Sequence, residues 1–114
     1  MQCYWTVYTD TNTRDAARTV VERLRSLADV EFCEIETEDY AKGGHKTRFH
    51  VDHDAANWTQ MVFDVILFSQ RLGHRWSIAG GVDEELSLTT THPIVPGIKM
   101  LTCWCSHLEH LGGG

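Results

Sequence analysis

The chain has 114 residues, of which 42% are hydrophobic, and this length accommodates one hydrophobic core but not two. Its 16 acidic and 10 basic side chains give a formal net charge of −6. This charge disfavours nucleic-acid binding, which usually requires a net basic surface. We expect a single domain over residues 1–108 and a flexible tail at 109–114. The apolar runs are too short to cross a membrane.

The beginning of the chain lacks the basic and apolar segments of a secretory signal peptide. The spacing of the four cysteines is not that of a disulfide framework. These two features predict a cytoplasmic protein whose thiols stay reduced. The oligomeric state is left open.

The first half of the chain predicts a strand, a helix and a hairpin. Aromatic and β-branched residues favour the first strand, and Thr13 is placed to cap the helix, whose apolar residues recur at helical spacing. Alternating side chains predict the two hairpin strands, which are joined through Gly43 and Gly44. These elements are expected at residues 2–9, 14–28, 30–37 and 46–52.

The second half predicts a helix and then mostly strands. Asn57 is placed to cap a helix over 57–72, and Phe63, Ile66 and Leu67 widen its apolar stripe so far that we expect a well-buried helix. Strands are expected at residues 75–79, 86–90 and 98–106. The four tryptophans, all within predicted elements, are expected in the core.

The resulting order of elements is β-α-β-β-α-β, with extra short strands inserted before the last one. This order predicts an α+β domain with a ferredoxin-like antiparallel sheet and two helices on one of its faces.

Two groups of residues are candidates for metal binding. Cys103, Cys105 and His107 share one face of a strand and are zinc-type ligands, but a straight strand spreads them about 6–7 Å apart. His50 and Asp52 share the outward face of another strand, where a solvated strand end is the alternative interpretation. We therefore predict neither a metal site nor a bound cofactor.

Familiar catalytic motifs do not occur in the sequence. It has no phosphate-binding loop, no G-x-S-x-G elbow, no H-E-x-x-H helix and no paired C-x-x-C. We therefore predict that the protein is not an enzyme.

Two acidic clusters are candidates for binding a partner. Alternating glutamates in the second strand either protect a sheet edge from aggregation or face a basic partner, and one row can serve both purposes. A second acidic group occupies a turn, and one tyrosine adds an aromatic anchor. The predicted partner-binding residues are Glu34, Glu36, Glu38, Asp39, Tyr40, Asp83, Glu84 and Glu85.

The last third of the chain carries a resemblance to a known family. Its features are the segment 73–80 (GHRWSIAG), the acidic run at 83–85 followed by Leu86, and Pro93 and Gly97 before a tryptophan-bearing strand. Together with the order of elements, this pattern resembles the small immunity proteins of bacterial polymorphic toxin systems, including contact-dependent growth inhibition. The resemblance implies a cytosolic protein that binds a cognate toxin domain, often a basic nuclease, and blocks its active site or an exosite.

Two other classes stay open at this point. One is a dimeric ferredoxin-like enzyme or small-ligand-binding module with a pocket between sheet and helices. The other is a metal-dependent regulator that uses the segment 103–107.

Overall fold

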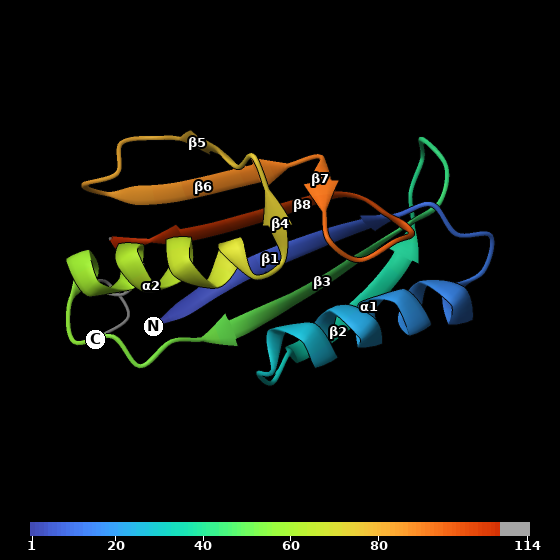
Figure 1. The fold of residues 1–114 in the computed structure, drawn as a ribbon, viewed down its shortest axis with the longest axis horizontal. Helices are drawn as coiled ribbons and strands as arrows, with labels where there is room; N and C mark the ends of the chain where they lie inside the picture. Colours follow the sequence, from blue (N-terminus) through green and yellow to red (C-terminus); the bar gives the residue numbers. More distant parts are fainter. Residues whose placement is uncertain (108–114) are drawn as a thin grey trace.

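Two helices pack on one face of a six-stranded antiparallel sheet in the computed structural model, which describes residues 1–107 (Figure 1). The tail predicted at 109–114 lies outside the described residues. In chain order the elements are β1 (Gln2–Thr9), α1 (Arg14–Ala28), β2 (Cys33–Asp39), β3 (His45–Asp52), α2 (Trp58–Gln70), β4 (Gly73–His74), β5 (Ser77–Ala79), β6 (Glu85–Thr90), β7 (His92–Pro93) and β8 (Ile98–Ser106).

The six strands lie in the order β2-β3-β1-β8-β6-β5, and every neighbouring pair is antiparallel. The predicted α+β class with two helices and an antiparallel sheet is therefore confirmed. The strand order predicted for a ferredoxin-like sheet is not confirmed, because β6 and β5 continue the sheet beyond β8. Leu86 and Leu88 are buried and oppose Cys105 and Cys103, so β6 extends the core side of the sheet.

The first and last strands of the described chain are neighbours near the middle of the sheet. β1 pairs with β3 on one side and with β8 on the other (Figure 1). Val7 of β1, for example, stands opposite Thr47 of β3 and Leu101 of β8, and all three side chains are buried.

Both helices begin at the predicted caps. The side chain of Thr13 accepts a hydrogen bond from the backbone N–H of Ala16, and that of Asn57 accepts one from Gln60. These bonds satisfy backbone donors that the first turn of a helix leaves without a partner.

The prediction that α2 is well buried is wrong. Its inner residues, such as Met61 and Val65, are buried, but Phe63 and Leu67 are 60% and 53% exposed. In a fold of two layers, a helix that covers a sheet has only one side against the core. Neither α1 nor α2, the two helices within residues 1–107, is long and apolar enough to span a membrane.

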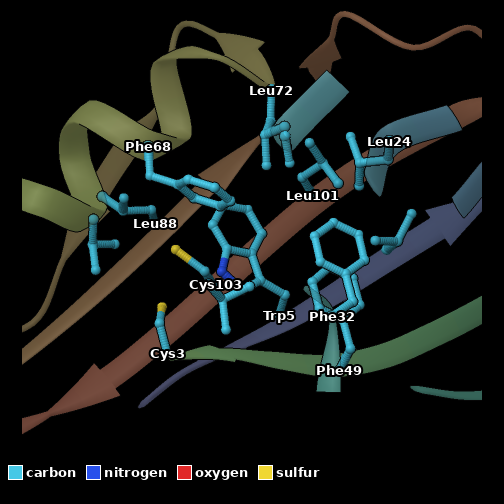
Figure 2. Close-up of a cluster of buried hydrophobic side chains, with 14 of the residues drawn as sticks. Cys3, Trp5, Leu24, Phe32, Phe49, Phe68, Leu72, Leu88, Leu101 and Cys103 are labelled. Carbon is cyan, nitrogen blue, oxygen red and sulfur yellow. The ribbon is translucent and has the colours of Figure 1, made fainter. Parts of the chain in front are cut away.

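The core lies between the sheet and both helices, with Trp5 of β1 near its centre (Figure 2). The Trp5 ring is stacked 6.4 Å from that of Phe49 and meets the Phe68 and Trp76 rings edge-on at 5.6 and 5.8 Å. Leu24 of α1 belongs to the same buried cluster as Phe68 of α2, so the two helices share one face of the sheet. The outer face is not covered by either helix.

Candidate functional site

The uncovered side of the sheet, which we term the open face, displays the alternate side chains of the long strands. Tyr4, Thr6 and Tyr8 of β1 point to this side, because Trp5 and Val7 point into the core. Residues directly opposite them in the antiparallel register lie on the same side. The open face thus includes Tyr4, Thr6, Tyr8, Glu36, Glu38, Lys46, Arg48, His50, Met100, Thr102, Trp104 and, on β6, Glu85, Ser87 and Thr89.

An aromatic cluster lies at one end of the open face. The Tyr4 ring is 6.1 Å from the His50 ring and 6.0 Å from the Trp104 ring, measured between centroids. Tyr4 and Trp104 are 37% and 39% exposed. The indole N–H of Trp104 donates to Glu85 at 3.2 Å, which fixes the ring on the surface. Aromatic rings that are half-exposed and fixed in position are typical anchors in protein interfaces.

The predicted row of glutamates is only partly free to meet a partner. The Glu38 carboxylate lies 2.9 Å from the Arg48 guanidinium and 3.5 Å from the Lys46 ammonium, so the chain's own cations neutralise it. Glu36 stands opposite Arg48 in the register but forms no ion pair within residues 1–107. Glu36 therefore remains available to an external cation.

Glu34 interrupts the regular alternation of β2. Its φ is 53°, in the left-handed region, and the pairing register of β2 with β3 shifts between Cys33 and Glu36. This irregularity is a β-bulge, which re-aims side chains in a strand. The Glu34 carboxylate lies 3.7 Å from Nδ1 of His50. With Tyr4, Glu36 and Arg48 among the other lining residues, Glu34 and His50 border a shallow hollow of about 260 Å³.

Tyr40 follows β2 at the other end of the open face. Its ring packs edge-on against Tyr8 at 5.1 Å, and the ammonium groups of Lys46 and Lys99 lie 5.9 and 6.0 Å from its centroid. Tyr40 therefore lies beside the open face, as part of a cationic and aromatic corner rather than an acidic one.

The remaining acidic candidates lie elsewhere. Asp39 is engaged by His45 at 3.3 Å and by Arg14 at 3.8 Å. Asp83 and Glu84 occupy the turn between β5 and β6, and Asp83 borders a groove beside α2. The eight predicted residues therefore do not form one surface. Only Glu34, Glu36, Glu38, Tyr40 and Glu85 gather on or next to the open face.

Sequence reasoning missed the aromatic cluster, because it placed all four tryptophans in the core. Trp5 and Trp58 are buried and Trp76 is half-buried, but Trp104 points outward. The signal for this was strand alternation, since buried cysteines at 103 and 105 require an outward residue between them.

The thiols of the last strand belong to the core. Cys103 and Cys105 are buried beside Cys3, and hydrogen bonding between neighbouring thiols together with burial raises the pKa of Cys3 and Cys105. His107 instead stacks on Trp58, with ring centroids 5.4 Å apart. Within residues 1–107, the one group of three metal-ligand side chains is Cys33, His50 and Asp52.

No protein-family model, curated protein or solved structure matches this chain.

Proposed function

We propose that this protein binds and neutralises a basic toxin domain, as immunity proteins do, and that the open face is its binding surface. The observation that carries the proposal is the aromatic pair Tyr4 and Trp104, held side by side on a sheet face that neither helix covers. The resemblance of the last third of the chain to immunity proteins supplies the class of partner.

The chemistry of the open face suits a basic protein. Tyrosine and tryptophan contribute large contact areas at little cost in side-chain entropy. Glu34 and Glu36 lie close to them and form no ion pair with a lysine or arginine within residues 1–107. These carboxylates are therefore placed to meet cations of a partner around the aromatic contact. The net charge of −6 adds long-range attraction that speeds encounter with a basic domain.

The test is co-expression with the toxin domain encoded next to this chain's gene, followed by titration of the two purified proteins. We expect protection of the cells and a complex at submicromolar concentration. Replacing both Tyr4 and Trp104 by alanine should abolish both results. Phe63→Ala, which removes an exposed aromatic side chain from α2 on the other side of the sheet, should leave them intact. Absence of protection and of a complex at micromolar concentration would overturn the proposal.

A second candidate function has one specific observation in its favour. The hollow on the open face is lined by a histidine, a tyrosine and an arginine, His50, Tyr4 and Arg48, and a second copy docked sheet to sheet would enclose it. This arrangement would suit a dimeric small-ligand-binding module or enzyme. It differs from the predicted pocket between sheet and helices, where Trp5 packs against Phe49 and Phe68 (Figure 2). Light scattering separates the two candidates, because the second requires a dimer without any partner.

A further inference from the structure

Three side chains of metal-ligand type meet at the edge of the open face. Cys33 begins β2 and stands opposite His50 of β3, and Asp52 lies two residues beyond His50 on the same side of that strand. One potential ligand atom from each residue lies within 4.8 Å of those of the other two. In a tetrahedral zinc site with bonds of about 2.0–2.3 Å, ligand atoms stand roughly 3.3–3.8 Å apart. Small rotations of the three side chains are therefore enough to bring all three ligand atoms within bonding distance of one ion.

The β-bulge in β2 is a second observation that points to a site at these three residues. The register of β2 against β3 shifts between Cys33 and Glu36, and Glu34 within the shift adopts a φ of 53°. A left-handed conformation is unfavourable for a residue with a side chain, and such residues concentrate at functional sites. Here the bulge brings the Glu34 carboxylate to 3.7 Å from Nδ1 of His50. A carboxylate beside a histidine is the usual neighbour of a metal-binding imidazole.

The local electrostatic potential also suits a cation. The carboxylates of Asp52, Glu31 and Glu34 lie close enough to Cys33 to interact with it electrostatically. The same negative groups attract a divalent ion. On binding, the ion replaces the thiol proton, which leaves to solvent, and the thiolate becomes the ligand.

We propose that Cys33, His50 and Asp52 form a binding site for Zn²⁺ or a chemically similar divalent transition metal, with Glu34 as the supporting carboxylate. One sulfur, one imidazole nitrogen and carboxylate oxygens are the donors that zinc accepts, whereas magnesium and calcium require oxygen donors alone. The proposal does not depend on the toxin-binding function, and it reverses the sequence-based prediction that no metal is bound.

Cobalt provides a test that reports the ligands directly. Co²⁺ should bind the purified, reduced, metal-free protein with one equivalent per chain and produce the near-ultraviolet thiolate-to-cobalt charge-transfer band. Cys33→Ala should remove this band. His50→Ala and Asp52→Asn should each weaken Co²⁺ and Zn²⁺ binding by at least about tenfold. The control His92→Ala, which removes an exposed imidazole outside the site, should change nothing.

Folding of each variant is checked by its thermal unfolding transition in the presence of a chelator. Zinc should raise the midpoint of the starting protein but not that of Cys33→Ala, because a ligand that binds only the folded state stabilises it. The proposal is overturned if no band appears, if the band persists in Cys33→Ala, or if His92→Ala weakens binding as much as His50→Ala. The toxin-binding function is tested separately, by measuring the complex in the presence of a chelator. If the complex forms equally well there, the proposed function holds independently of the result of the metal test.

Discussion

Phe32 stacks on Phe49 with ring centroids 3.8 Å apart and an angle of 8° between the ring planes. Phe49 belongs to β3, whereas Phe32 lies in the connection between α1 and β2, and both side chains are buried. The same Phe49 ring is stacked 6.4 Å from Trp5. This row of three rings fastens the chain that leaves α1 to the middle of the sheet.

Replacing Phe32 by alanine should therefore destabilise the whole domain. A buried phenylalanine lost to alanine lowers the free energy of unfolding by about 3–5 kcal/mol, through lost transfer free energy and the cavity left behind. Urea unfolding followed by tryptophan fluorescence measures this change. Phe63→Ala is the matched control, since Phe63 is largely exposed, and its effect should stay within about 0.5 kcal/mol. Similar losses in both variants would contradict the role assigned to the Phe32–Phe49 stack.

Gly44, in the turn between β2 and β3, should tolerate alanine much less well than its neighbour Gly43. Both have positive φ values, 79° and 97°, which cost an alanine about 1–2 kcal/mol. A Cβ at Gly44 would also collide with the backbone carbonyl oxygen of Thr9, whereas a Cβ at Gly43 would meet no atom within 4 Å. We expect Gly44→Ala to lose at least about 1 kcal/mol more than Gly43→Ala in urea unfolding. Equal losses would show that the positive φ alone, and not the collision with Thr9, determines the loss of stability.

The four cysteines should divide into one reactive and three protected thiols. Cys33 is partly exposed, whereas Cys3, Cys103 and Cys105 are buried. With Ellman's reagent we expect one thiol to react in the folded, metal-free protein, none in Cys33→Ala, and all four in denaturant. Rapid reaction of more than one thiol in the folded state would contradict the buried assignment.

The buried thiols also predict sensitivity to alkaline pH. Hydrogen bonding and burial raise the pKa of Cys3 and Cys105 in the folded state. A raised pKa contributes stability that is complete below the pKa of the unfolded thiol and is lost as the pH rises above it. The free energy of unfolding should therefore fall above about pH 9. A flat profile up to pH 10 would contradict this expectation.

Aromatic and charged residues of the open face should affect partner binding in different ways. Trp104→Ala should weaken the complex by about 2 kcal/mol or more, mainly through faster dissociation. Reversal of charge at Glu34 and Glu36 should mainly slow association, and this effect should shrink at high salt. Stopped-flow mixing with the proposed toxin partner at two salt concentrations measures both rates. A charge reversal whose effect is independent of salt would contradict the role of these carboxylates in steering.

The secondary structure was largely predictable because local patterns encode it. Caps at Thr13 and Asn57 and the helical spacing of apolar residues identify both helices. Local patterns do not encode how many layers of structure pack around a helix. The exposure of Phe63 and Leu67 was missed for this reason. The place of the β5–β6 hairpin in the sheet likewise depends on its pairing with β8, which lies elsewhere in the sequence.

The candidate site was predictable only in part, for a related reason. Alternation placed Glu36, Glu38 and His50 outward, but it does not reveal which cations stand across the strand. The ion pairs that neutralise Glu38 depend on the register between β2 and β3. The proximity of Cys33 to His50 and Asp52 depends on the same register and on a bulge at Glu34. No residue type in this segment predicts that bulge.

The position of β8 has a consequence for the way the protein is made. Within residues 1–107, β8 is the only strand that joins β6 and β5 to β1, and at residues 98–106 it follows all the other strands in the sequence. Until those residues leave the ribosome, a nascent chain can assemble β2, β3 and β1 as one fragment and the β5–β6 hairpin as another, with no shared sheet between them. Contacts so distant in sequence also slow folding, because a long loop must close before they form. Until β8 has been made, β1, with the apolar side chains of Trp5 and Val7, therefore lacks one of its two neighbouring strands, and an unpaired strand edge beside apolar surface makes a partly folded chain prone to aggregation.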